Sequence, residues 1–222
     1  MEWRAQWIWV DGPDRHPYNE TIMARRVFAL AEIARATLAI TADAVYRLFI
    51  NGHWVEDGPC RSWPGHFQYD VLDVTALLHP GENEIVVVAR HFGMSTFHRV
   101  PREAGLLAQL DVVAADGTPL CIATDARWQA ARGAAHVADT ARISIQMDQA
   151  EWYDARLENK GDFTPAAELF PADGGPWKDL NHATWPSSAA RRCSSRASWV
   201  RAWSNPKGSI SAFSPRSRIT RA

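Results

Sequence analysis

The chain has 222 residues, of which 46% are hydrophobic and 22% are charged, and its formal net charge is −1. These values are typical of one or two folded domains and exclude a collagen-like or wholly disordered chain. The chain has no net basic charge that would favour binding to nucleic acid. It also has no run of 18 apolar residues, so no membrane span is predicted. The first residues lack the basic and apolar regions of a signal peptide. Three cysteines (Cys60, Cys121 and Cys193) make no even disulfide framework, so we expect reduced thiols and a cytoplasmic location.

The charge is unevenly distributed along the chain. Residues 1–179 hold all 25 acidic residues and 16 basic ones, whereas residues 180–222 hold 8 basic residues and no acidic one. This tail is rich in Ser and Arg and shows no sustained hydrophobic period, so it is not expected to bury a face. Three interpretations are open for it: a disordered end, an out-of-frame product, or a basic arm that binds nucleic acid.

Residues 1–179 predict many short strands in chain order. Asn51-Gly52 and Asp116-Gly117 are hairpin signals because tight turns need positive φ angles. Residues 29–36 are expected to form a loop or turn, and residues 73–78 a short helical turn that Pro80-Gly81 ends. The expected strands are Ala36–Ala42, Tyr46–Ile50, His53–Val55, Phe67–Val71, Asn83–Arg90, Leu106–Ala115 and Pro119–Thr124. This pattern predicts an all-β antiparallel sandwich or jelly roll.

Eleven tryptophans are unusual for this length, and their positions suggest two roles. Trp7 and Trp9 are two residues apart, so we expect them to share one face of the first strand and anchor it in the core. Trp54 follows a hairpin and Trp63 lies in a loop, where an exposed ring can stack on a sugar.

A polar cluster lies in the segment Glu151-Trp152-Tyr153-Asp154-Ala155-Arg156. Glu151 and Asp154 offer oxygens that could hydrogen-bond sugar hydroxyls or coordinate Ca²⁺. The alternative is a structural ion pair between Asp154 and Arg156. Phosphate-loop, dinucleotide and metalloprotease motifs are absent. His91 and His98 are seven residues apart in an expected loop, which matches no common zinc spacing.

Several segments together resemble the N-terminal β-sandwich region of bacterial α-L-rhamnosidases. They follow the family's order and cover most of residues 3–160. Thr41-Ala42-Asp43, Asn51-Gly52 and Pro80-Gly81-Glu82-Asn83 also occur in other galactose-binding-like sandwiches. The segment that points more specifically to the rhamnosidases is Tyr153-Asp154-Ala155-Arg156, which follows Thr124-Asp125-Ala126-Arg127-Trp128 in the chain. Trp7-Ile8-Trp9, Asp57-Gly58-Pro59, Tyr69 to Thr75 and Gly105 to Leu110 complete the resemblance.

The resemblance implies a parent enzyme that removes terminal α-L-rhamnose by inverting hydrolysis, with catalytic carboxylates in an (α/α)₆ barrel that follows the sandwiches. Twelve helices need about 140 residues, more than the 43 residues after position 179. The similarity fades after Pro176 to Leu180, so no catalytic residue is transferred.

The resulting prediction is a non-catalytic accessory fragment that binds a rhamnose-containing glycan or glycoside. The predicted binding residues are Trp54, Trp63, Trp152, Asp154 and Arg156, and the family allows for Ca²⁺. The alternatives are a purely structural module that self-associates through a bare interdomain surface, an enzyme with its site inside the sandwich, and a nucleic-acid-binding protein.

Overall fold

The computed structural model describes residues 2–97, 99–100, 102–158 and 161–183. The predictions made for the tail, including Cys193, fall almost entirely on residues 184–222 and lie outside the described residues, as does His98. Across the described ranges, no helix is both long enough and apolar enough to cross a membrane.

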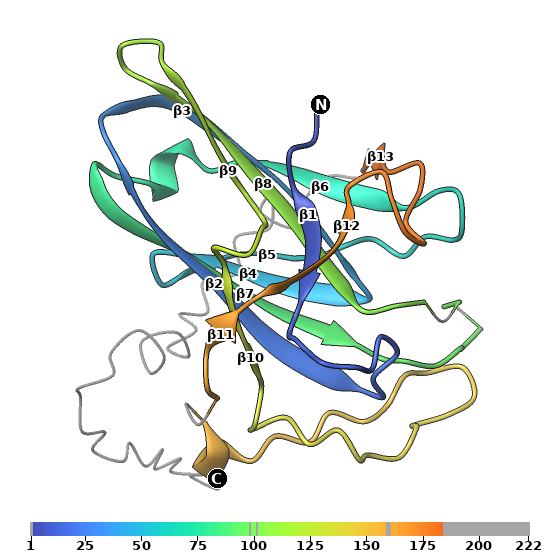
Figure 1. Ribbon diagram of the computed structural model, residues 1–222. Coiled ribbons are helices and arrows are strands. Elements are labelled where there is room, and N and C mark those ends of the chain that lie inside the picture. Colours follow the sequence, from blue (N-terminus) through green and yellow to red (C-terminus); the bar gives the residue numbers. More distant parts are fainter. Residues whose placement is uncertain (1, 98, 101, 159–160, 184–222) are drawn as a thin grey trace, which may run out of the picture.

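The chain folds into two β-sheets packed as a sandwich, which confirms the predicted fold class (Figure 1). In sheet A the path runs β12 (Ala167–Pro171), β1 (Gln6–Trp9), β8 (Gly105–Ala114), β3 (Ile33–Asp43), β6 (Gln68–Asp73) and β13 (Asn181–His182), and β9 (Pro119–Ala123) also pairs with β8. In sheet B the order is β11 (Thr164–Pro165), β10 (Gln129–Arg132), β2 (Glu20–Leu30), β7 (Gly81–His91), β4 (Val45–Ile50) and β5 (His53–Gly58). Of the strand pairs in the described residues, β13 with β6 is parallel and the others are antiparallel.

The main core lies between the two sheets. Ile22, Leu48 and Ile85 of sheet B meet Leu38 and Leu106 of sheet A there, all at most 1% exposed. Because side chains alternate along a strand, the neighbours of the sheet B residues point to the other side of that sheet. The middle of β7 is therefore covered on both faces at Ile85, Val86 and Val87, which are at most 7% exposed.

The local turn signals are confirmed. Asn51 and Gly52 have φ angles of 48° and 77° and join β4 to β5, as a type I′ turn requires. Gly117, at φ 86°, turns β8 into β9. The expected helical turn is the 3₁₀ helix η1 (Thr75–Leu77).

Two local predictions are wrong. Residues 29–36 are not a loop, because β2 continues to Leu30 and β3 begins at Ile33. All 11 residues of β2 pair with β7, and this pairing with a distant strand keeps residues 29 and 30 extended. Trp7 and Trp9 do not share a face either. The pairing of β1 with β12 shifts register between Trp7 and Ile8, so Trp9 enters the main core while Trp7 faces away from it. Both rings are buried, as their predicted anchoring role requires.

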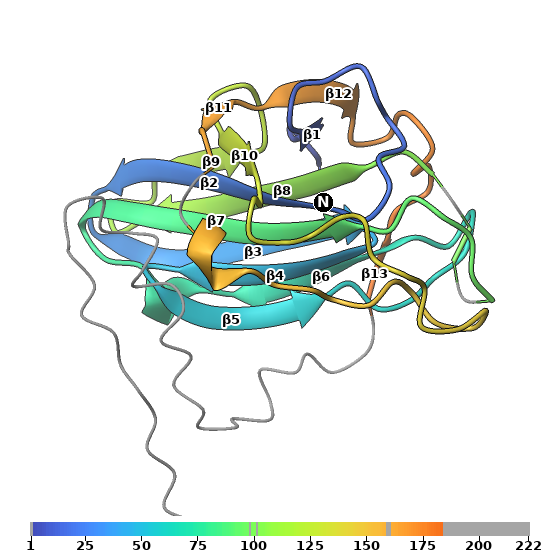
Figure 2. The ribbon, with the colours of Figure 1, turned by 90° about the horizontal axis from the view of Figure 1, so that it is seen from below.

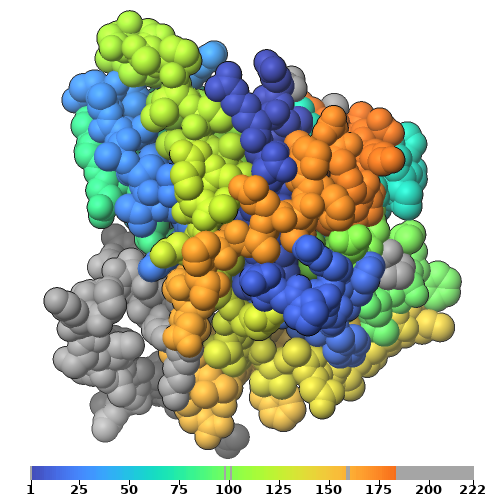
Figure 3. All heavy atoms as spheres, in the orientation of Figure 1, coloured from blue at the N-terminus to red at the C-terminus, as the bar shows by residue number. Residues whose placement is uncertain are grey.

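The outer face of sheet A is sealed by the last described segment of the chain. Trp177 stacks on Trp7 with ring centroids 4.0 Å apart, and both rings are at most 2% exposed. Phe67, Leu107 and Ala172 complete this second cluster. Figure 3 shows the C-terminal part of the described chain, in orange, lying against the N-terminal strand in blue.

The two ends of the sandwich differ in the length of their connections. Short turns at residues 31–32, 51–52 and 115–118 lie at one end. Long connections at residues 10–19, 59–67, 92–104 and 172–180 lie at the other, where the segment after β10 also begins. This long-loop end is on the right in Figures 1 and 2.

Candidate functional site

A groove of about 670 Å³ lies on the outer face of sheet B. Strands β2, β7, β4 and β5 form its base, and residues from the segment 133–158 form one wall. Figure 2 shows this segment crossing in front of the sheet. The groove is thus built from parts of the chain that are more than a hundred residues apart.

The floor of the groove is apolar. Met23, Phe49 and Val86 form a small buried cluster, with the partly buried Val88 and Phe163 packed against it. Met23, Phe49, Val86 and Val88 are neighbours in sequence of the core residues Ile22, Leu48, Ile85 and Val87, so strand alternation places them on the opposite face. The floor can therefore contact the apolar part of a ligand.

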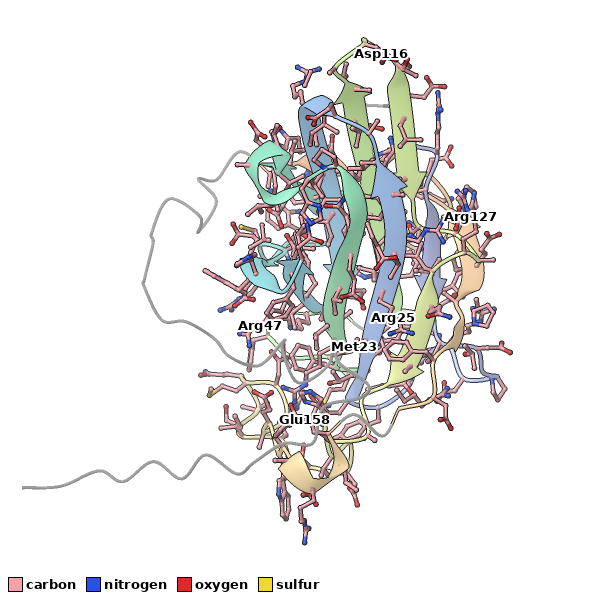
Figure 4. The ribbon with its side chains drawn as sticks, turned by 90° about the vertical axis from the view of Figure 1, so that its left-hand side faces the viewer. Met23, Arg25, Arg47, Asp116, Arg127 and Glu158 are labelled. Carbon is pink, nitrogen blue, oxygen red and sulfur yellow. The ribbon has the colours of Figure 1, made fainter. Side chains whose placement is uncertain are left out.

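One rim of the groove carries two arginines in different environments. Arg47 on β4 donates to both carboxylate oxygens of Asp57 on β5, at 2.8 and 3.0 Å, and this bonding raises the pKa of Arg47. Arg90 on β7 is more enclosed, and burial lowers its pKa. Its guanidinium donates to Asn19 Oδ1 at 2.7 and 2.9 Å, which fixes its orientation. Figure 4 shows Met23, Arg47 and Glu158, all of which line the groove.

The facing wall holds His136, Glu151 and Tyr153. The His136 ring packs edge-on against Tyr153, with centroids 5.0 Å apart, and its Nδ1 lies 3.7 Å from a Glu151 oxygen. Burial lowers the pKa of His136, and the Glu151 carboxylate partly opposes this shift. Burial also raises the pKa of Tyr153, with a further contribution from a hydrogen bond to Glu158. This wall therefore presents an imidazole and a phenol beside the carboxylates of Glu151 and Glu158.

A tight contact joins the two sheets beneath β4, on the side of sheet B away from the groove. The Tyr46 hydroxyl donates to Asp70 Oδ2 at 2.5 Å. Burial raises the pKa of both groups, although the hydrogen bond partly offsets the rise at Asp70. A side chain at Gly58 would collide with both residues, so this position needs glycine.

The structure places Trp54 beside the groove and Trp63 away from it. The Trp54 ring is 39% exposed and donates from Nε1 to Asp57 Oδ1 at 3.1 Å, which connects it to the Arg47 rim. Trp63 is 62% exposed and packs on His66 in the loop after β5. The two rings do not line a common surface with the groove residues.

The predicted cluster around Trp152 lies in an extended segment whose side chains alternate in direction. Its members therefore do not all face the groove. Glu151 and Tyr153 line the groove, whereas the 65% exposed Trp152 does not. Asp154 caps the 3₁₀ helix η2 (Ala155–Leu157) and accepts from Arg156 at 2.8 and 2.6 Å. The structural ion pair considered from the sequence is therefore present.

These residues do not form a calcium site. Both Asp154 oxygens are occupied by Arg156, and Glu151 faces His136. Within the described ranges, no group of three or more His, Cys, Asp or Glu side chains is placed to hold a metal ion.

His91 was expected in a loop but is the last residue of β7 and is 1% exposed. Its Nδ1 lies 3.0 Å from Asp43 Oδ2, and Arg102 donates to the other oxygen of Asp43 at 2.8 Å. These three side chains line a small cavity of about 40 Å³ at the long-loop end. They connect β3, β7 and the segment before β8, so the network holds the base of that end together.

Comparison with known proteins assigns this sandwich to a protein family. The family model described as "Alpha-L-rhamnosidase N-terminal domain" matches residues 31–200, more than half of the chain. The chain belongs to this family. The match crosses the boundary at residue 180 where the sequence pattern changes.

Curated relatives are much longer than this chain. It is 33% identical over 144 residues to an alpha-L-rhamnosidase of Streptomyces avermitilis, covering 60% of this chain and 13% of that protein. It is 31% identical over 178 residues to one of Formosa agariphila, covering 71% of this chain and 18% of that protein. The chain thus spans less than a fifth of either relative.

Solved structures agree with the family assignment. The GH78 family rhamnosidase of Bacillus sp. GL1 is 35% identical, with a TM-score of 0.77 over 84% of this chain and 20% of that one. A lectin from Pleurotus ostreatus shares the fold at 20% identity, with a TM-score of 0.52 over 79% of this chain and 44% of its own.

Proposed function

We propose that this chain is a non-catalytic, carbohydrate-binding sandwich of an α-L-rhamnosidase-type glycoside hydrolase. The observation that carries the proposal is the groove on sheet B, where an apolar floor lies below a ring of fixed hydrogen-bonding groups. A ligand site of this kind buries the apolar face of a small molecule and selects it by a few oriented polar contacts.

The chemistry of the groove suits a deoxysugar such as L-rhamnose. Its methyl group and C–H faces match the floor of Met23, Phe49 and Val86. Its hydroxyls both donate and accept, so they match the donors Arg47 and Arg90 and the acceptor Glu151. Trp54, which bonds to Asp57 beside the groove, remains a predicted contact for a larger glycan, as do Trp63, Trp152, Asp154 and Arg156.

The proposed role is binding rather than hydrolysis. The chain spans about a fifth of the Bacillus rhamnosidase, and the family resemblance assigns the catalytic carboxylates to a barrel outside this region. We therefore expect purified protein to release no rhamnose from an aryl rhamnoside. A rate abolished by a single Asp or Glu substitution would contradict this part of the proposal.

A titration with L-rhamnose tests the binding site. Arg47→Ala should weaken the affinity at least about tenfold, since it removes a charged donor from the rim. The matched control is Arg127→Ala, because Arg127 is similarly exposed and also pairs with a carboxylate, Asp125, away from the groove (Figure 4). Equal affinity of the two variants, or no response of the wild-type protein to millimolar L-rhamnose, would refute the proposed site.

We also propose a cytoplasmic location, which the unbonded Cys60 and Cys121 support. The competing function is a structural module without a ligand. Exposed apolar side chains on the loops are the observation that favours it. The two functions are compatible, since those side chains lie outside the groove.

A further inference from the structure

Three buried nitrogen atoms without a hydrogen-bond partner belong to side chains that line one small cavity at the long-loop end. This cavity has a volume of about 40 Å³, and its lining includes His91, Arg102 and Trp177. Within the described residues, His91 Nε2, Arg102 Nη1 and Trp177 Nε1 are buried and have no partner. Folded proteins leave few buried polar atoms unpaired, so three of them around one cavity indicate a bound ligand.

The three nitrogen atoms come from parts of the chain that are far apart in sequence. His91 ends β7, Arg102 lies in the segment before β8, and Trp177 belongs to the segment that covers the outer face of sheet A. The side chain of His91 is 2% exposed, and Trp177 is also 2% exposed. A ligand bound to all three would therefore connect sheet B to the segment that covers sheet A.

Neighbouring contacts fix the orientation of each group. His91 Nδ1 lies 3.0 Å from Asp43 Oδ2, which leaves Nε2 on the other side of the ring. Arg102 donates from Nε and Nη2 to Asp43 Oδ1 at 3.2 and 2.8 Å, and its guanidinium lies 3.7 Å from the centroid of the Phe67 ring. Trp177 is held by the aromatic stack on sheet A. The groups are thus positioned before a ligand binds, which lowers the entropy cost of binding.

The chemistry of these groups favours an anion. A guanidinium and an indole can only donate hydrogen bonds, so the ligand must accept them. In the described part of the lining, the arginines are Arg61, Arg99 and Arg102, whereas Asp43 is the one carboxylate. Arg99 is paired with Asp148, at 3.2 Å, but Arg61 and Arg102 still exceed Asp43 in charge. The cavity therefore has a surplus of positive charge around it, which attracts an anion.

The size of the cavity limits which anion can enter. One water-sized site needs about 10–15 Å³ of such volume, so a cavity of about 40 Å³ holds about three non-hydrogen atoms. Chloride and formate are within this limit. Butyrate carries the same charge as formate but has twice as many non-hydrogen atoms, so it is too large.

A proton on His91 completes the charge balance. In the neutral ring, a proton on Nδ1 bonds to Asp43 and leaves Nε2 as an acceptor, which repels an anion. A proton taken up on Nε2 makes this atom a donor and offsets the charge of the anion. The other titratable or charged groups in the described lining of the cavity are Asp43, Cys60, Arg61, Arg99 and Arg102.

We propose that this cavity binds one small monovalent anion, such as chloride or formate, between His91 Nε2, Arg102 Nη1 and Trp177 Nε1, together with a proton on His91. The anion binds only where these three parts of the chain meet, so it stabilises the folded sandwich over the unfolded chain. None of the three side chains lines the groove, so the proposal is independent of sugar binding.

Thermal unfolding of the 222-residue chain tests the site. Sodium chloride or sodium formate replaces sodium butyrate in separate titrations at constant ionic strength. The unfolding temperature should rise along a saturable curve in at least one titration, because only the smaller anions fit the cavity. A flat response to both chloride and formate would overturn the proposal. For the anion that responds, the apparent dissociation constant should be lower at pH 6 than at pH 8, and equal values would contradict the role of the His91 proton.

Two tryptophan variants locate the effect in the cavity. Trp177→Phe keeps an aromatic ring for the stack but removes the indole N–H, so the apparent dissociation constant should rise about tenfold or more. Trp128→Phe is the matched control, since Trp128 is 1% exposed but already donates from Nε1 to Ala123 O at 2.9 Å. This control should keep the response of the wild-type protein. Equal dissociation constants for the two variants would overturn the proposed site.

Discussion

The outer faces of both sheets carry apolar side chains, but one face is covered by the chain and the other is left partly open. On sheet A, Trp177 returns from the end of the described chain and stacks on Trp7, so that face becomes a second core. On sheet B, the segment 133–158 stands over Met23, Phe49 and Val86 but leaves a groove of about 670 Å³. One outer face is thus covered by the chain itself, and the other is left open to a ligand.

The difference is also electrostatic. The sealed face is made of aromatic and aliphatic side chains. The open face is surrounded by Arg47, Arg90, His136 and Glu151, each of which already has a partner on the protein. Such pairing keeps the polar groups fixed, so a ligand meets an ordered site. The three predictions below perturb the sealed face, the contact between the two sheets and the groove itself.

Trp177→Ala should have the largest effect, because it empties the centre of the sealed face. Loss of a buried tryptophan typically costs about 3–5 kcal/mol in free energy of unfolding. Urea unfolding followed by circular dichroism measures the loss. Trp63→Ala is the control, since that ring is 62% exposed and should cost less than about 0.5 kcal/mol. Similar losses for the two variants would show that the aromatic stack does not stabilise the sheet.

Tyr46→Phe should have an intermediate effect. It leaves the partly buried Asp70 carboxylate without its closest donor, and an unsatisfied buried group costs about 1–3 kcal/mol. Adding Asp70→Asn removes the unpaired charge and should recover part of the loss. Absence of recovery in the double variant, measured by the same unfolding experiment, would mean that the hydroxyl acts through packing alone.

His136 should give the smallest effect, visible as a pH dependence. Burial holds its pKa below the ordinary value of about 6.5, so the unfolded chain binds more protons than the folded one. Its contribution to stability is present above pH 6.5 and is lost as the pH falls through the lower folded pKa. His136→Gln should therefore flatten this part of the stability profile between pH 8 and 5. An unchanged profile would place the titrating group elsewhere.

Local signals in the sequence predicted the parts of the fold that depend on neighbouring residues. Asn51-Gly52 forms the expected hairpin because both φ angles are set within the turn. Strand β2 was not recognised, since Arg25 and Arg26 interrupt its apolar pattern and its partner β7 lies more than fifty residues away. His91 was misplaced because its partner Asp43 comes from a distant strand.

The groove was less predictable than the fold. Its lining residues come from four strands and one long segment, and their meeting depends on register, which composition does not reveal. The sequence did direct attention to the right segment at residues 151–156. Alternation then brought Glu151 and Tyr153 to the groove, where Trp152 and Asp154 had been expected to bind. Which of these side chains face the groove depends on the backbone bridge between Tyr153 and His136. The sequence around residues 151–156 does not reveal that bridge.

Both outermost strands of the sheet A path, β12 and β13, come from the last 17 described residues, 167–183. During synthesis, a ribosome therefore exposes β1 and β6 as open sheet edges until nearly the whole sandwich has been made. Open edges pair readily with other chains, and contacts between distant residues form slowly. A nascent chain stopped before residue 167 should need chaperone protection, whereas one released after residue 183 has covered β1 and β6 with the short strands β12 and β13.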